Sequence, residues 1–199
     1  MPGRKHISPR HSPPGAYGLT AIIFHWLVGL LFLVQIPLGY LTQAVASRPA
    51  LQFDLYQWHK SVGFLILALA LLRLAWRLLT KSPAPPEGLP HWELAAARLA
   101  QALLLLLTVV VPLTGWLIAS TSPLRIPSYV FNLVVVPHLP LTPSQDADRL
   151  WSSLHAYLAY AAGLLALVHI GAALWHHFLL RDETLSRMLP PAGSHRRTR

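Results

Sequence analysis

The sequence predicts an all-α protein, a four-helix transmembrane bundle with both termini in the cytoplasm. Of its 199 residues, 54% are hydrophobic and only 12% are charged, whereas soluble domains carry about 25% charged residues. The apolar residues form four blocks long enough to cross a bilayer, which takes about 20 residues each. The net charge of +9 comes from basic residues that flank these blocks, so we expect contact with lipid and not with nucleic acid.

The four apolar stretches define the domain organisation. The first runs from Leu19 to Leu41; it is longer than the apolar core of a secretory signal, about 7–15 residues, so we expect it to be retained. The others run from Gln57 to Leu79, from Leu94 to Ala119 and from Trp151 to Leu180. We therefore expect a membrane domain over residues 18–189, a disordered cytoplasmic tail over 1–17 and a basic tail over 190–199.

The distribution of Lys and Arg predicts the orientation. Twelve of these residues fall on the side of the two tails and the second connection, and four fall on the other side. The positive-inside rule places the richer side in the cytoplasm. The chain is thus predicted to be a multi-pass protein of the bacterial inner membrane, with a long periplasmic loop between Ser120 and Arg149 that could cover a site.

Histidines inside the spans are the candidate functional residues, because ionisable groups are costly in a membrane. His155 and His169 share the fourth span and are fourteen residues apart. In a helix this interval gives roughly 21 Å of separation and returns to nearly the same face. His59 matches the depth of His155, and His25 matches the depth of His169.

These depths predict two bis-histidine sites, His59 with His155 on the periplasmic side and His25 with His169 on the cytoplasmic side. Two axial imidazoles suit a low-spin haem that transfers electrons. The chain has no cysteine, so covalent attachment is excluded and two non-covalent haem b groups are expected. The alternative is that the histidines make hydrogen bonds between helices.

Three further residues accompany the histidines. Gly29 and Gly63 each lie four residues after a histidine, where they either give clearance to a porphyrin or allow close helix packing. Arg73 is fourteen residues after His59, which places it at the cytoplasmic haem with a propionate or a quinone carbonyl as partner. Arg77 lies one turn later and could join that site, but both arginines could instead only reach the cytoplasmic interface.

The segments around these residues resemble the prokaryotic cytochrome b561 family. The matching segments are IIFHWLVGLL, WHKSVGF, LLRLAWRLL, VPLTGWLIA and SLHAYLAYAAGLLALVHIGAALWHHFLLRDETLSRMLP, and the likeness runs from about Leu19 to Pro190. The resemblance implies a small dihaem, quinone-linked membrane cytochrome whose axial ligands are His25, His59, His155 and His169.

Two stacked haems would form a path for electrons across the bilayer. The resemblance implies a membrane quinone as acceptor, for which we expect ubiquinone, and His176 could exchange protons with it unless it is only an interfacial residue. Lys60, Arg125 and Arg149 could attract an anionic periplasmic donor, or contact lipid headgroups instead. The resemblance makes superoxide one candidate electron donor, and a small periplasmic redox protein is the other. With superoxide as the donor, the expected activity is that of a superoxide oxidase.

Two alternatives remain from the sequence. The chain could be the haem-bearing membrane anchor of a larger dehydrogenase or hydrogenase. It could instead be a non-redox scaffold or proton path that uses its histidines as polar contacts.

Overall fold

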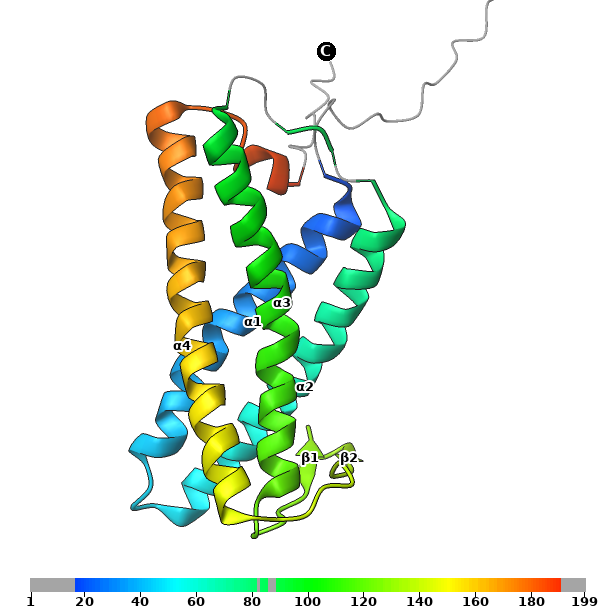
Figure 1. Cartoon of the computed structure of the whole chain (residues 1–199), viewed down its shortest axis with the longest axis vertical. Coiled ribbons are helices and arrows are strands. Elements are labelled where there is room, and N and C mark those ends of the chain that lie inside the picture. Colours follow the sequence, from blue (N-terminus) through cyan, green and yellow to red (C-terminus); the bar gives the residue numbers. More distant parts are fainter. Residues whose placement is uncertain (1–16, 82, 86–88, 191–199) are drawn as a thin grey trace, which may run out of the picture.

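Four long helices form the protein (Figure 1). The computed structural model describes residues 17–81, 83–85 and 89–190, so residues 1–16 and 191–199 of the two predicted tails lie outside it. The helices are α1 (Leu19–Ala44), α2 (Pro49–Leu79), α3 (His91–Thr121) and α4 (Gln145–Trp175). Each is long and apolar enough to span a membrane, which confirms the predicted four-helix transmembrane fold.

The helices alternate in direction, so α1 begins and α4 finishes at the same end of the bundle (Figure 1). We call this the terminal end, and the opposite end, which holds the α1–α2 connection and a small hairpin, the hairpin end. α1 packs along α2, α2 against α3, and α3 against α4, whereas α1 and α4 touch at few positions. α1 runs obliquely behind α3 and α4 in the view of Figure 1.

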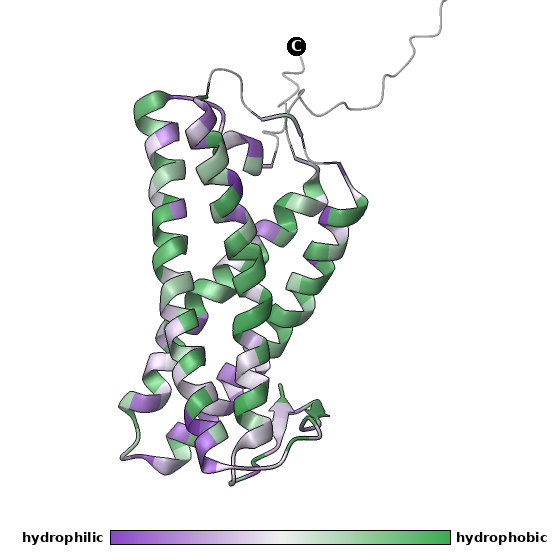
Figure 2. Ribbon diagram, viewed as in Figure 1, coloured by the Kyte–Doolittle hydropathy of each residue, from purple (hydrophilic) through white to green (hydrophobic). Residues whose placement is uncertain are grey.

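Most apolar side chains face outward from the bundle. In the most apolar window of α4, only 6% of the residues are buried inside the protein. Figure 2 shows green, hydrophobic ribbon along all four helices, with polar residues gathered at the two ends. Small side chains such as Ser61, Ala70 and Ala162 occupy the buried interior, as is usual where helices meet in a membrane. The outward face is therefore the lipid-facing surface of a multi-pass membrane protein.

Two helices begin earlier than their apolar stretches. α2 starts at Pro49, where the fixed φ of proline suits the first helical turn, and its first two turns carry polar residues that hydropathy does not detect. α4 starts after Ser144, whose side chain accepts a hydrogen bond from the Ala147 N–H. Asp146 and Asp148 in its first turn also favour the positive end of the helix dipole.

A short antiparallel hairpin interrupts the α3–α4 connection and was not predicted. It pairs β1 (Ser128–Val130) with β2 (Val134–Val136), in a register that sets Tyr129 opposite Val135. In Figure 1 it lies beside the last turns of α3, and it does not extend past the ends of the helices. The loop expected to cover a site from above therefore lies largely at the side of the bundle.

At the terminal end, residues 181–189 follow the π-helical turn His176–Leu180 and fold back over the bundle. We call this segment the C-terminal strap; it contains a short 3-10 turn over Ser186–Met188. The Tyr17 N–H and the Trp26 indole donate to the carbonyls of Arg187 and Met188 at 3.3 and 2.7 Å. The Arg187 guanidinium donates to the Ala84 carbonyl at 2.8 Å. The strap thus links α1, the α2–α3 connection and α4.

Candidate functional site

The structure brings the four intramembrane histidines together as two pairs. The ring centroids of His59 and His155 are 6.0 Å apart, and those of His25 and His169 are 6.3 Å apart. Two imidazoles that share one metal ion through bonds of about 2 Å have ring centroids roughly 6 Å apart. We call His59 and His155 the hairpin-end pair, and His25 and His169 the terminal-end pair. Both separations fit a metal held between the two rings.

The number of protein donors restricts the kind of metal centre. Within the described residues, no group of three or more His, Cys, Asp or Glu side chains could hold a metal ion. A metal bound by only two imidazoles needs further ligands from a non-protein group, and a porphyrin supplies four in one plane. The residues of both pairs therefore fit a bis-histidine haem better than a protein-ligated metal ion.

The hairpin-end pair has one histidine of defined tautomer. His155 Nδ1 lies 3.0 Å from the Val111 carbonyl oxygen and 2.9 Å from Thr114 Oγ1. A carbonyl can only accept, so Nδ1 carries the proton and donates it. The Thr114 hydroxyl itself donates to the same Val111 carbonyl at 2.7 Å. The Nε2 lone pair of neutral His155 is consequently free to bind a metal.

The ring of His59 sits against a glycine of the neighbouring helix α1. A Cβ atom at Gly39 would lie only 2.9 Å from His59 Cε1, closer than real side chains approach. The Gln35 amide, also on α1, donates to the His59 carbonyl at 2.7 Å and fixes the backbone there. Gly115 plays the same part for His155, because a Cβ there would lie 3.3 Å from His155 Cε1. Close packing against glycine thus orients both rings of the hairpin-end pair.

The terminal-end pair lies next to the charged side chain of Arg73. Arg73 Nη2 lies 3.2 Å from His25 Nδ1, and arginine can only donate, so Nδ1 is the acceptor. Neutral His25 then carries its proton on Nε2. Metal binding through Nε2 would move that proton to Nδ1 and free the guanidinium for another acceptor. Arg73 therefore lies beside the terminal-end histidines, at the depth that its spacing predicts.

The two predicted glycines have different surroundings. A Cβ at Gly29 would meet nothing within 4 Å, whereas a Cβ at Gly63 would meet the Gln35 amide nitrogen at 3.4 Å. Open space near Gly29 fits the clearance interpretation, and contact near Gly63 fits helix packing. Sequence reasoning missed Gly39 and Gly115. Gly39 had a usable signal, because it follows His25 by the same fourteen-residue interval that separates His155 from His169.

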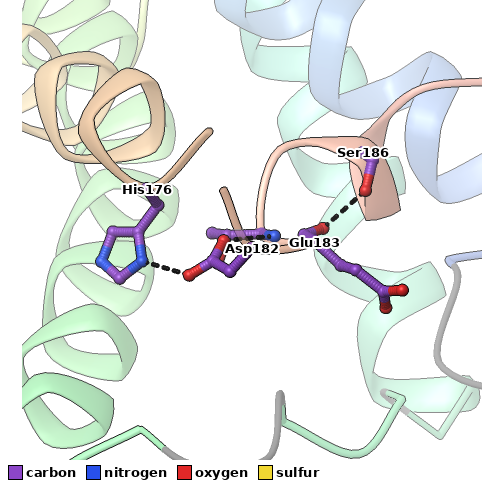
Figure 3. A network of polar contacts seen from close by, with 5 residues as sticks. His176, Asp182, Glu183 and Ser186 are labelled. Carbon is purple, nitrogen blue, oxygen red and sulfur yellow. Dashed lines mark hydrogen bonds and ion pairs between the residues drawn. The ribbon is translucent and has the colours of Figure 1, made fainter. Parts of the chain in front are cut away.

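His176 of the predicted quinone site pairs with the C-terminal strap. Its Nδ1 lies 2.5 Å from Asp182 Oδ2 (Figure 3). Burial raises the pKa of Asp182, but hydrogen bonds from His176 and Thr184 outweigh it, so the pKa lies below its ordinary value. The carboxylate is therefore ionised and accepts a hydrogen bond from Nδ1 of His176. Arg77 is exposed, and among the described residues no hydrogen bond joins it or Arg73 to His176.

The three basic residues of the predicted donor site are only partly brought together. The Lys60 ammonium donates to the Pro127 carbonyl at 3.0 Å, which ties it to the loop that carries Arg125. Arg125 is exposed and has a left-handed backbone with φ 48°. Arg149 is exposed in the first turns of α4, and no interaction with the other two is present in the part of the chain that the structure describes.

Comparison with known proteins identifies the family. The family model described as prokaryotic cytochrome b561 matches residues 16–191. Cytochrome b561 homolog 2 of Escherichia coli K12 is 29% identical over 181 residues, which cover 91% of this chain and 95% of that protein. The probable superoxide oxidase CybB of Yersinia pestis is 28% identical over 178 residues, which cover 87% of this chain and 96% of that protein.

A third relative is cytochrome b562 of Cereibacter sphaeroides, which is 31% identical over 137 residues, 67% of this chain and 66% of that protein. The family match spans all four helices and both histidine pairs. The chain therefore belongs to the prokaryotic cytochrome b561 family, the b-type haem proteins that carry out electron transfer in the inner membrane.

Proposed function

We propose that the chain holds two haem b groups and conducts electrons across the inner membrane from a periplasmic donor to a quinone. This proposal rests on the two histidine pairs, whose ring centroids are 6.0 and 6.3 Å apart. Helix α4 contributes one histidine to each pair, and these two residues are fourteen positions apart. His59 with His155 and His25 with His169 would hold the two haems through their ring nitrogens. A bound haem would accept and release one electron at a time.

The proposed orientation has the hairpin end facing the periplasm. Of the described basic residues, the terminal end carries Arg73, Arg77, Lys81, Arg98, Arg181 and Arg187, whereas the hairpin end carries Arg48, Lys60, Arg125 and Arg149. The positive-inside rule then assigns the terminal end to the cytoplasm. A reporter that is active only in the cytoplasm, fused after Arg199, should be active; an active periplasmic reporter at the same place would reverse the assignment.

The terminal end has a candidate proton-transfer residue, His176, and a candidate hydrogen-bond donor to the quinone, Arg73. Ubiquinone takes up two electrons and two protons to give ubiquinol. His176 Nδ1 lies 2.5 Å from Asp182 Oδ2, which orients the ring as a candidate to pass protons between water and the quinone. If His25 held a haem through Nε2, the Arg73 guanidinium would be free to donate to a haem propionate or to a quinone carbonyl.

Superoxide is the proposed donor. The likeness to the probable superoxide oxidase of Yersinia pestis and the basic residues Lys60 and Arg125 support it, because positive charge draws in an anion. Two superoxide ions each lose one electron and leave as dioxygen, and one quinone gains both electrons and two protons. Superoxide-driven reduction of ubiquinone by the purified protein tests this assignment. Lys60→Gln should slow it several-fold and make it less sensitive to salt, whereas absence of any such activity would favour a periplasmic redox protein.

The haem assignment has a direct test. Purified protein should show two haems b per chain by pyridine haemochrome, with a low-spin reduced-minus-oxidised spectrum. His59→Ala should remove the haem of the hairpin end and His25→Ala that of the terminal end, each leaving about one haem per chain. His91→Ala, at the exposed start of α3, is the control and should keep both. Two haems retained in His59→Ala and in His25→Ala would refute the pairing.

A further inference from the structure

The turn and second strand of the β1–β2 hairpin are strongly apolar, and the described residues leave them uncovered on both faces of the strand. Leu133, Val134 and Val135 are 84%, 61% and 54% exposed. Arg125 is the only charged residue between Ser122 and Ser144. Figure 2 shows β2 in green, the hydrophobic end of the scale. A water-facing loop of a membrane protein does not ordinarily expose so many neighbouring apolar side chains.

The hairpin is attached at the depth of the hairpin-end histidines. The Gln57 amide donates to the Pro127 carbonyl at 3.1 Å and its oxygen accepts from the Tyr129 N–H at 3.2 Å. Ser61 Oγ shares its one proton between the Gln57 carbonyl at 2.7 Å and the Tyr129 carbonyl at 3.2 Å, and it accepts from the Phe131 N–H at 2.9 Å. Gln57 and Ser61 flank His59 and lie at the start of the apolar span of α2. The hairpin thus lies beside the span, at the edge of the hydrocarbon layer.

These contacts also give hydrogen-bond partners to backbone groups of the hairpin that would otherwise be unpaired in apolar surroundings. The backbone N–H and C=O of Tyr129 point away from β2 and toward α2. These two groups and the Phe131 N–H have side-chain partners on α2. Backbone groups without partners would be costly in lipid. In the described chain the sheet has two strands, so the free edge of β2 needs water or headgroups. This combination suits the membrane interface and not the hydrocarbon centre.

The turn of the hairpin is held in a strained form against the lipid-facing surface. Phe131 and Asn132 have φ of 51° and 57°, a left-handed conformation that is unfavourable for a bulky residue such as phenylalanine. The Phe131 ring makes an edge-to-face contact with Trp58 at 5.9 Å. Trp58 is 57% exposed and stands where interfacial tryptophans form a belt. The apolar face of the hairpin is therefore continuous with the lipid-facing surface of α2.

We propose that the hairpin is an interfacial membrane anchor that inserts Leu133, Val134 and Val135 into the leaflet at the hairpin end. Its partner is the bilayer itself, at the boundary of headgroups and acyl chains. The anchor also holds Pro127, the acceptor for Lys60, and so fixes the level of Lys60 relative to the membrane. The proposal depends on the transmembrane fold and not on haem content or on the electron donor.

Site-directed spin labelling tests the anchor, and the absence of cysteine makes single-cysteine variants straightforward. Leu133→Cys is labelled on the hairpin, and Thr142→Cys, exposed on the stretch that leads to α4, is the matched control. Both proteins are reconstituted in phosphatidylcholine–phosphatidylglycerol vesicles with their haem content and helicity checked. Collisions with oxygen report lipid, and collisions with a water-soluble nickel chelate report water.

The label at position 133 should collide with oxygen several-fold more, relative to the nickel chelate, than the label at position 142. Equal access of the nickel chelate to both labels would overturn the proposal and place the hairpin in water. Protection of position 133 from both reagents would also overturn it, because a protein partner or a second copy would then cover the hairpin. The accessibility of the labels is measured independently of electron transfer, so a failure of the proposed function would not change these results.

Discussion

The two histidine pairs are built in different ways, although one helix contributes to both. In the hairpin-end pair, His59 rests on Gly39 of α1 and His155 rests on Gly115 while its Nδ1 donates to the Val111 carbonyl. Packing orients both rings, and a hydrogen bond further fixes that of His155. In the terminal-end pair, the arginine Arg73 occupies His25 Nδ1.

Packing therefore orients the hairpin-end pair, whereas a neighbouring charge dominates the surroundings of the terminal-end pair. The hairpin-end rings already stand where a metal fits between them, so their haem should be sensitive to small changes of volume. The terminal-end pair has open space beside Gly29 and a cation that must change partner when a metal binds. Its haem should tolerate changes of volume better and respond to changes of charge.

Gly39→Ala should have the largest effect, because the new Cβ would lie 2.9 Å from His59 Cε1. Overpacking of this kind costs about 1–3 kcal/mol, and the His59 ring has to turn away from His155. We expect loss of most of the hairpin-end haem, measured as a fall to about one haem per chain. Gly18→Ala, where a Cβ meets nothing within 4 Å, should keep both haems. Unchanged haem content in Gly39→Ala would remove packing as the organising feature of this pair.

Arg73→Gln should have an intermediate effect that is confined to the terminal-end haem. A nearby positive charge favours the reduced form, so its removal should lower the midpoint potential. A unit charge about 8–10 Å away, at an effective dielectric constant of about 20, gives roughly 50–100 mV. Redox titration of the purified protein measures it, and Arg77→Gln, at an exposed position one turn further on, should shift the potential less. A shift in the hairpin-end haem instead would reverse the comparison.

Asp182→Asn should have the smallest effect, a loosening of the C-terminal strap by roughly 0.5 kcal/mol, as for a partly exposed ion pair. The pKa of Asp182 is lowered in the folded protein, so its stabilisation is complete above the ordinary pKa of 3.8 and is lost as the pH falls through the lowered value. Hydrogen exchange of residues 181–189 should therefore be faster in the variant at pH 7, with the difference fading in acid. Glu183→Gln, whose carboxylate is 75% exposed, is the control; an equal effect there would rule out a specific role of the His176–Asp182 pair.

The sequence predicts much of this architecture because its strongest signals are local. The start of α1 at Leu19 and the end of α2 at Leu79 agree with the structure, and the fourteen-residue interval on α4 predicts that histidines meet at two depths. The hairpin was missed because its turn uses Phe131 and Asn132 at positive φ, where sequence rules look for glycine. The contacts of Gly39 and Gly115 with histidines depend on how neighbouring helices pack, which local spacing does not encode.

The C-terminal strap has a consequence for biosynthesis. His155 and His169 both belong to α4, and the strap that follows binds Tyr17 and Trp26 near the start of the chain. Three inserted helices therefore offer only one histidine of each pair, and residues that follow the fourth helix help to secure the first. On the proposed haem assignment, a nascent chain interrupted before α4 would hold neither haem through two histidines.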